Sequence, residues 1–318
     1  QEVVYYRPER EAQVLRRIME RDQGPLPGEN VAHVFREIMS ACLALEQPLQ
    51  VAYLGPEGTF THAAVQKHFG HAAQTVPLGA IDEVFRAVET ETVAFGVVPV
   101  ENSTEGVINH TLDMFLNSPL SISGEVVIRI HHNLVGSVDD LAGVKKVLSH
   151  QQSLAQCRNW LNTNLPNVER EAVSSNAEAA RLASNDTSVV AIAPSAAAEI
   201  YQLNTLAAKI EDETDNTTRF LIIGKQDVAP SGNDKTSVLF AAPNKPGALY
   251  ELLKPLAEYN IDMDRLESRP SRGGLWEYVF FVDFSGHHDD TDIAPALQQL
   301  KDNAPLYRVL GSYPKAAY

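Results

Sequence analysis

The sequence has 318 residues, of which 44% are hydrophobic and 21% charged, a composition typical of a globular protein with two or three domains. Its formal net charge of −15, with no cluster of Lys and Arg, argues against a nucleic-acid partner, because neutralising phosphates requires clustered cations. Cys42 and Cys157 are too few to indicate a disulfide framework, and no apolar run is long enough to span a membrane. We therefore expect a soluble, cytoplasmic protein that does not bind membranes.

Two helices are predicted first, over residues 8–22 and 28–46. Leu15 and Ile18 belong to an apolar set at helical spacing in the first helix, and Pro48 marks the end of the second. Because the chain begins with Gln rather than Met, we expect the natural protein to extend further upstream.

From residue 49 the pattern changes to strands alternating with helices, which is typical of a largely parallel sheet covered on both faces. This middle domain covers residues 49–228, and APSGND (229–234) has the composition of a linker. The remainder, 235–318, has the order strand, helix, strand, strand, helix, strand of a ferredoxin-like unit. Its expected elements are 236–243, 247–259, 261–268, 275–284, 292–302 and 307–313.

Three predicted strands of the middle domain end in a similar way. VAYLG, AFGVVPV and VKKVLSH are followed by PEGTF, ENSTEG and QQS, and each of these segments leads into a predicted helix. Helix N-termini carry partial positive charge, and ligands of open α/β sheets bind beyond the carboxyl ends of the strands. The three ends together predict a site for a small anion, although each one alone could be an ordinary helix cap.

The segment DNTTRF, residues 215–220, precedes an apolar run, LIIG, that we expect to be a buried strand. No His or Cys in this local sequence could activate its threonines. Alternatively, Thr217 and Thr218 are strand-favouring residues and Arg219 forms a surface ion pair.

Four motifs in this order resemble those of prephenate dehydratases: GPEGTF (55–60), PVENSTEG (99–106), SHQQSLAQC (149–157) and NTTRF (216–220). GAL (247–249) and ESRP (267–270) resemble the phenylalanine-binding motifs of the ACT domain that follows the catalytic domain in this family. The resemblance covers residues 50–318. One departure is Gln151, where the family commonly has Pro, and this affects the rigidity of that loop.

The resemblance implies an α/β fold of two lobes, similar to periplasmic solute-binding proteins, with the active site between the lobes. It implies conversion of prephenate to phenylpyruvate with loss of carbon dioxide and water. Because this reaction creates an aromatic ring, the enzyme needs only to hold the carboxylates and help hydroxide leave as water. No metal or cofactor is implied.

Thr218 matches the family's essential threonine, and we interpret its hydroxyl as a hydrogen-bond donor to the leaving oxygen. Arg219 would anchor a substrate carboxylate or support its own loop. A threonine hydroxyl is too weak an acid to supply the proton, so we expect Glu101 or His150 to relay it. The simpler alternatives are that His150 is a loop histidine and that Glu101 and Asn102 cap a helix.

Other residues of the matched motifs are expected to contact the substrate, with the helix starts near Thr59 and Ser103 helping to hold its carboxylates. The full set of expected binding residues is Thr59, Phe60, Asn102, Ser103, Ser149, Thr217 and Phe220. The adjacent histidines 131–132 and 287–288 are not expected to bind metal, because neighbours on a strand point to opposite faces.

The ACT resemblance implies that phenylalanine binds across a dimer interface, between the two ACT motifs, and inhibits the enzyme. The implied contacts are Gly247, Ala248, Leu249, Glu267, Ser268, Arg269 and Pro270. Gly247 would let the backbone approach the ligand, or would simply make a turn after Pro246. We expect a homodimer or a higher homo-oligomer.

The first 46 residues resemble the second and third helices of the all-α chorismate mutase that is fused to this dehydratase in bifunctional bacterial enzymes. Arg10 and Glu11 match its substrate-binding pair, Glu46 lies where the family has Gln or Glu, and Cys42 lies where Ser is common. The long first helix, with its chorismate-binding cations, is not in this sequence. We therefore expect little mutase activity from this chain and expect it in the full-length parent.

Three domains are thus expected: a partial, helical chorismate mutase (1–48), the dehydratase (49–228) and the ACT domain (235–318). Two alternatives stay open, arogenate dehydratase, whose substrate has an amine in place of the side-chain ketone, and a non-catalytic amino-acid sensor. Thr218 favours an enzyme, because a sensor does not need a donor at a leaving group.

Overall fold

The computed structural model describes residues 6–270 and 278–316. The chain groups into two compact units, one made of residues 1–48, 117–125 and 221–318, the other of 49–116 and 126–220. Within the described residues, no helix combines the length and the apolar character that crossing a membrane requires.

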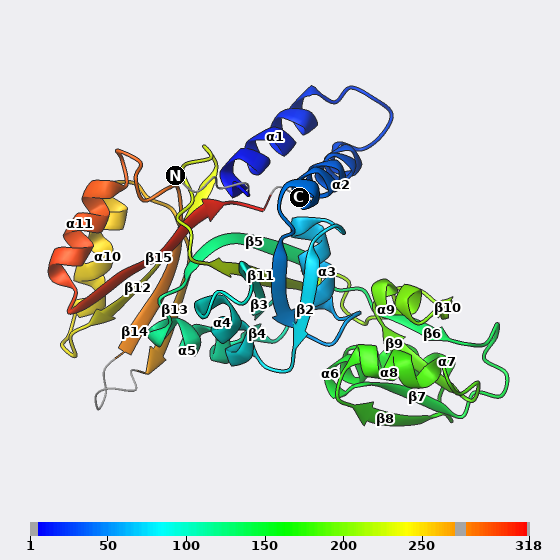
Figure 1. The fold of residues 1–318 in the computed structure, drawn as a ribbon. Helices are drawn as coiled ribbons and strands as arrows, with labels where there is room; N and C mark the ends of the chain where they lie inside the picture. The colour runs from blue at the N-terminus through cyan, green and yellow to red at the C-terminus, as the bar shows by residue number, and fades with distance from the viewer. Residues whose placement is uncertain (1–5, 271–277, 317–318) are drawn as a thin grey trace. The chain divides into compact units, whose positions relative to one another are not determined.

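The N-terminal helices of the first unit are α1 (Pro8–Arg21) and α2 (Gly28–Glu46), as predicted. They pack against each other (Figure 1) and bury Leu15 completely. An ion pair of 3.2 Å between Arg36 Nε and Glu11 Oε1 joins them. Burial raises the pKa of Glu11, and Arg36 opposes this shift.

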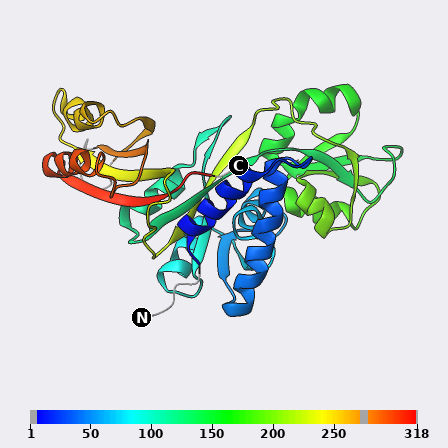
Figure 2. The ribbon, with the colours of Figure 1, turned by 90° about the horizontal axis from the view of Figure 1, so that it is seen from above.

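The C-terminal part of the first unit is an antiparallel sheet with the order β13-β14-β12-β15. Helices α10 and α11 lie side by side on one face of this sheet (Figures 1 and 2) and bury side chains such as Leu252 and Leu297 against Phe240. This is the predicted ferredoxin-like order; residues 275–277 of the expected third strand lie outside the described residues. The elements are β12 (Asp234–Ala242), α10 (Ala248–Glu258), β13 (Met263–Pro270), β14 (Tyr278–Ser285), α11 (Ala294–Asn303) and β15 (Leu306–Pro314).

Residues 229–234 form an ordered turn rather than a loose linker. Ser231 Oγ donates to Asp234 Oδ1 at 2.6 Å, and Ser231 N donates to Asp234 Oδ2 at 2.8 Å. Both residues are buried, and Asp234 is already the first residue of β12. The polar composition of this segment therefore reflects a side-chain-capped turn.

The first lobe of the α/β region is built on a six-stranded sheet of order β2-β1-β3-β11-β5, with β4 paired to β3. β1 is parallel to β2 and β3, and the β3–β4 pair is antiparallel. The strands are β1 (Gln50–Leu54), β2 (Gln74–Leu78), β3 (Phe95–Asn102), β4 (Gly106–Val107), β5 (Ser121–Arg129) and β11 (Thr217–Gly224). The helices are α3 (Phe60–Phe69), α4 (Ile81–Glu89) and α5 (Asn109–Asn117).

The second lobe is a five-stranded sheet of order β10-β6-β9-β7-β8, accompanied by the four short helices α6 to α9; Figure 1 shows their arrangement. Its core is rich in Val, Ala and Leu, with Val190, Ala191 and Ile192 of the central strand fully buried. The strands are β6 (Asn133–Gly136), β7 (Lys146–His150), β8 (Glu169–Val173), β9 (Val189–Ala193) and β10 (Asn204–Ala207). The helices are α6 (Gln151–Gln156), α7 (Arg158–Asn164), α8 (Asn176–Ala183) and α9 (Ser195–Ile200).

The chain passes between the lobes twice, after β5 and before β11, and the expected two-lobed α/β class is confirmed. The sheets are mixed rather than largely parallel. β7 is parallel to β8 and β9, whereas β6 is antiparallel to β9 and β10. A helical crossover imposes parallel pairing, but β6 follows a passage from the other lobe and so escapes this constraint.

The two interlobe passages are hydrogen-bonded to each other. Ile130 N donates to Asn216 O at 2.8 Å, and Ile210 N donates to His132 O at 2.8 Å. The buried carboxylate of Glu211 accepts from His132 N at 2.9 Å and lies 2.7 Å from His131 Nδ1. These contacts fix the residues that face the space between the lobes.

Candidate functional site

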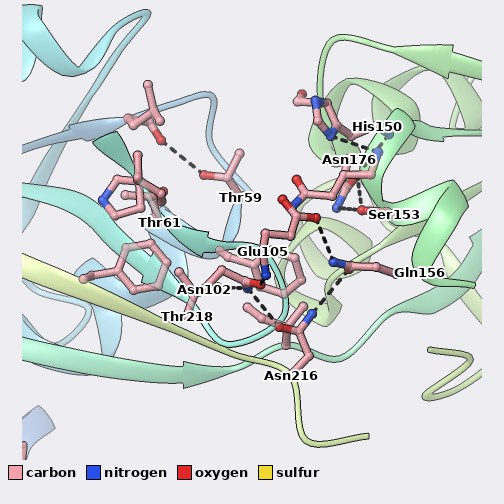
Figure 3. A pocket seen from close by; sticks show the side chains of 18 of the residues that line it. Thr59, Thr61, Asn102, Glu105, His150, Ser153, Gln156, Asn176, Asn216 and Thr218 are labelled. Carbon is pink, nitrogen blue, oxygen red and sulfur yellow. Dashed lines mark hydrogen bonds between the residues drawn. The ribbon is translucent and has the colours of Figure 1, made fainter. Parts of the chain in front are cut away.

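A cavity of about 440 Å³ lies between the two lobes. Polar side chains from both lobes face one another across it (Figure 3). The lining residues are Leu54, Gly55, Thr59, Phe60, Thr61, Pro99, Asn102, Glu105, Gly106, Val107, Ile108, Ile130, His132, His150, Gln152, Ser153, Gln156, Ser174, Ser175, Asn176, Asn216, Thr218 and Phe220. None of these described residues is Lys or Arg, so an anion in this cavity would be held by hydrogen-bond donors and helix starts.

Thr218 stands at the start of β11, beside the end of β3. Asn102 Nδ2 donates to Thr218 Oγ1 at 2.8 Å, and Ser103 N donates to Thr217 O at 2.9 Å. Thr218 is only 8% exposed. Because its oxygen accepts the bond from Asn102, the single hydroxyl hydrogen of Thr218 is available to donate elsewhere.

The amide of Asn102 has a fixed orientation. Its Oδ1 accepts from Thr104 N at 3.0 Å, from Thr104 Oγ1 at 2.6 Å and from Glu105 N at 3.1 Å. Its Nδ2 also donates to Asn216 Oδ1 at 2.8 Å. With every donor and acceptor engaged, Asn102 must present NH₂ rather than oxygen to Thr218.

A hydrogen-bonded chain then crosses from the first lobe to the second. Gln156 Nε2 donates to Glu105 Oε1 at 3.2 Å, and Gln156 Oε1 accepts from Asn216 Nδ2 at 3.3 Å. The same Gln156 oxygen lies 2.8 Å from His132 Nε2, which we therefore take to carry the ring hydrogen. Figure 3 shows the bonds among Glu105, Gln156 and Asn216.

Burial lowers the pKa of His132 below the usual 6.5, although the bond to Gln156 opposes this shift. The ring is 1% exposed and packs edge-on against Phe60, with 5.7 Å between ring centroids. We conclude that His132 is neutral near pH 7 and serves as a donor to Gln156.

Asn176 organises the second-lobe wall. Its Oδ1 accepts from Ser149 Oγ at 2.9 Å and from His150 N at 3.1 Å, and its Nδ2 donates to Ser153 Oγ at 2.9 Å. Ser149 Oγ also lies 2.8 Å from Ile192 O. One side chain thus ties the end of β7 to the starts of α6 and α8.

Three helices begin at the cavity. The hydroxyl of Thr59 caps α3 by accepting from His62 N at 3.3 Å, and Ser175 caps α8 by accepting from Glu178 N at 3.0 Å. His150 Nδ1 accepts from Gln152 N at 3.4 Å at the start of α6. Helix starts attract negative charge, which suits an anionic ligand in a cavity without lining cations.

Six of the eleven residues expected to bind or react with the substrate line the cavity: Thr59, Phe60, Asn102, His150, Thr218 and Phe220. The other five do not: Glu101, Ser103, Ser149, Thr217 and Arg219.

Arg219 and Thr217 lie on the opposite face of β11 from Thr218 and Phe220, because successive strand residues alternate. The expectation that Arg219 directly anchors a substrate carboxylate is therefore not supported by its position. Glu101 pairs with Val107 in the β3–β4 ladder and is likewise outside the cavity lining, which leaves His150 of the two expected proton relays.

The expected helix start near Ser103 is also wrong. Residues 101–107 form the β3–β4 hairpin, and α5 begins only at Asn109. Asn102 therefore caps a hairpin turn rather than a helix. Ser103 instead pins the start of β11, since its Oγ accepts from Thr217 N at 2.9 Å.

Sequence reasoning missed several polar lining residues, notably Glu105, Gln156, Asn176 and Asn216. Glu105, Gln156 and Asn216 lie inside the matched motifs, so the motifs could have indicated them as lining residues. Asn176 follows a Ser that caps a helix, and only a Ser-x-x-Glu capping pattern at 175–178 marks that helix start.

Neither of the two adjacent histidine pairs lies on a strand, contrary to expectation. His287 and His288 lie in a turn, not a strand, and their rings stack with 4.5 Å between centroids. With Asp289 they form a group of potential ligand atoms within 4.8 Å of one another. However, His287 Nε2 lies 2.8 Å from Val228 O, and its Nδ1 accepts from Asp289 N at 3.1 Å, so both its nitrogens already have partners.

The two ACT motifs lie at one end of the strands of the C-terminal sheet. Ala242, at the end of β12, and Pro270, at the end of β13, both pair with Tyr278. Gly247 then starts α10 with φ +79°, a conformation that favours glycine. GAL and ESRP, with seventeen residues between them in sequence, are thereby brought to the same end of the sheet.

Among the expected mutase residues, Arg10, Cys42 and Glu46 are exposed on α1 and α2. Glu11 is half-buried in its ion pair with Arg36.

The family model for prephenate dehydratase matches residues 51–228, that for the ACT domain matches 236–302, and that for chorismate mutase type II matches 1–47. A bifunctional chorismate mutase/prephenate dehydratase of Pseudomonas aeruginosa is 58% identical over 98% of this chain and 86% of its own length. An arogenate dehydratase/prephenate dehydratase of Arabidopsis thaliana is 38% identical over 84% of this chain and 73% of its own.

Among solved structures, prephenate dehydratase from Arthrobacter aurescens in complex with L-Phe is similar, with a TM-score of 0.78 and 34% identity. The similarity covers 84% of this chain and 90% of that one. The chain therefore belongs to the prephenate dehydratase family, in the branch where the dehydratase follows a chorismate mutase segment.

Proposed function

We propose that this protein converts prephenate to phenylpyruvate in the cavity between its lobes. The ring carboxylate leaves as carbon dioxide, and its bonding electrons enter the ring as the C–OH bond on the far side breaks. The departing hydroxide takes up one proton and leaves as water. Aromatisation drives the reaction, so the protein must chiefly orient the dianion and assist the leaving group.

The observation that best supports this function is the hydrogen bond from Asn102 to Thr218. It turns the oxygen of Thr218 toward an amide donor and leaves the hydroxyl hydrogen to bond the leaving oxygen. Thr218 would thus stabilise charge that develops only as the C–O bond breaks. We assign the proton to His150 or to water, because His150 is the expected relay that lines the cavity.

The substrate carboxylates would be bound by the starts of α3 and α8 and by hydroxyl and amide donors of the lining residues. We assign substrate contact to Thr59, Phe60, Asn102 and Phe220. The other expected residues would act indirectly, by supporting the strand and loops that carry the substrate contacts. They are Thr217, Ser103, Ser149 and Arg219.

We further propose domains over 1–48, 49–228 and 235–318, with phenylalanine as a feedback inhibitor bound at the GAL and ESRP motifs. Residues 1–48 would correspond to the second and third helices of the mutase. The protein would be cytoplasmic and would assemble as a homodimer or larger.

The test is a spectrophotometric assay of phenylpyruvate formation from prephenate by the full chain, with arogenate in parallel and with phenylalanine added. We expect turnover of prephenate and inhibition by phenylalanine. A sensor without catalytic activity would bind phenylalanine but form no product from either substrate.

A further inference from the structure

Glu105 is the one carboxylate among the described residues that line the cavity, and it has no Lys or Arg beside it there. Glu105 is exposed, and Figure 3 shows its side chain between the two lobes. One oxygen accepts from Gln156 Nε2 at 3.2 Å, which is a neutral donor. The site proposed to bind a dianion thus contains an uncompensated negative charge, and the proposed reaction does not explain it.

The position of Glu105 relative to Thr218 is defined by Asn102. The amide of Asn102 contacts Thr218 Oγ1 through Nδ2 and Glu105 N through Oδ1, at 2.8 and 3.1 Å. From there the side chain of Glu105 reaches Gln156 of the second lobe. The backbone of Glu105 is therefore separated from Thr218 by one amide side chain, and its carboxylate lies at Gln156 of the second lobe.

The chemistry of the ring relates these two positions to two ends of the substrate. In prephenate and in arogenate the hydroxyl is on one ring carbon, and the three-carbon side chain is on the carbon directly across the ring. With the hydroxyl at Thr218, the side chain would extend away from Thr218, and we place it beside Glu105 and Gln156, which line the cavity. Prephenate has a neutral ketone in that side chain, whereas arogenate has an ammonium group.

We propose that Glu105 sets the preference between these two substrates, by attracting the ammonium group of an amino-acid side chain and disfavouring the more negative keto acid. This inference rests on the proposed function. A carboxylate beside an ammonium is favourable, whereas a carboxylate beside a dianion is not. The Arabidopsis relative, whose name includes both substrates, shows that both occur within this family.

The test compares Glu105→Gln with the unchanged chain. Glutamine keeps the size of the side chain and an oxygen that accepts from Gln156, and it removes only the charge. We expect the ratio of kcat/KM for arogenate to kcat/KM for prephenate to fall about fivefold to tenfold, the scale of one charge contact in a partly solvated site. The difference in this ratio between Glu105→Gln and the unchanged chain should become smaller when the salt concentration rises toward about 1 M.

Glu169→Gln is the matched control, since Glu169 is exposed on β8 and does not line the cavity. Its ratio should equal that of the unchanged chain. An unchanged ratio in Glu105→Gln, or no arogenate turnover by the unchanged chain, would overturn the assignment of Glu105 while leaving prephenate dehydration intact. Absence of prephenate turnover in the unchanged chain would instead overturn the proposed function.

Discussion

At the scale of single residues, the two adjacent threonines of β11 have different surroundings. Thr218 faces the cavity and accepts from Asn102, whereas Thr217 faces away and holds β11 to Ser103 through its backbone. Strand alternation separates two side chains that are chemically identical. The pair therefore offers a variant and its control on neighbouring positions.

We predict that Thr218→Val lowers kcat about 10²- to 10³-fold with a smaller change in KM, because it removes the donor that we propose for the leaving oxygen. The branched side chain keeps the volume and the strand propensity. Thr217→Val should change kcat by less than about threefold, since this side chain does not line the cavity. Steady-state kinetics with prephenate test both, and equal effects of the two variants would refute the assignment.

At the scale of elements, the second-lobe wall depends on Asn176. The ends and starts of three elements, β7, α6 and α8, meet at its amide, which bonds Ser149, His150 and Ser153. The end of β7, which carries His150, and the first turn of α6, which carries Ser153, are thereby held in one arrangement. These hydrogen bonds restrict the segment around Gln151, which a proline at this position would restrict through its fixed φ angle.

Asn176→Ala should lower the free energy of unfolding by about 1 to 3 kcal/mol, because it removes the amide that bonds the buried hydroxyl of Ser153 and one of the two acceptors of the buried hydroxyl of Ser149. KM for prephenate should rise as the wall loosens. Urea denaturation and kinetics measure the two effects. Asn185→Ala, at an exposed helix end, is the control and should change stability by less than about 0.5 kcal/mol.

At the scale of the whole molecule, the residues that we propose for catalysis and those that we propose for feedback belong to different compact units. The cavity residues belong to the unit of 49–116 and 126–220, and both ACT motifs belong to the other unit. Feedback then requires that phenylalanine bind with different affinity to two states of the protein.

Gly247→Val is expected to raise the phenylalanine concentration for half-maximal inhibition about tenfold or more, while basal turnover is kept. The φ of +79° disfavours a branched side chain, although no atom lies within 4 Å of the added Cβ. Gly143→Val is matched to it, with φ +87° and the same open surroundings, but is in the second lobe. Inhibition curves should differ only for Gly247→Val; undiminished inhibition there would contradict the proposed effector site.

Acid should destabilise the folded protein through its buried histidines. Burial lowers the pKa of His132 and of His62 below the usual 6.5, so the unfolded chain binds more protons just below that pH. The contribution of these two histidines to the free energy of unfolding is therefore fully present above about pH 6.5. It is lost as the pH falls toward the lower pKa values that the histidines have in the folded protein. Urea unfolding between about pH 7.5 and pH 5.5 should show this loss, by at most about 1.4 kcal/mol per pH unit for each group.

His132→Gln should reduce this pH dependence, whereas His33→Gln, at an exposed position of α2, should leave it unchanged. If the unchanged chain and both variants lose the same stability between these pH values, groups other than His132 are responsible for the loss.

The two N-terminal helices, the element order of the ferredoxin-like C-terminal unit and the motifs could be predicted from the sequence, because periodicity and capping are local properties. The sequence also identified Thr218 and Asn102, which lie within motifs. Tertiary structure alone decided that Thr218 and not Arg219 faces the cavity, since alternation depends on where β11 begins and what it pairs with. It also decided that Asn102 meets Thr218, 116 residues away, and that Gln156 reaches Glu105 across the lobes, because such contacts form only when the chain folds back.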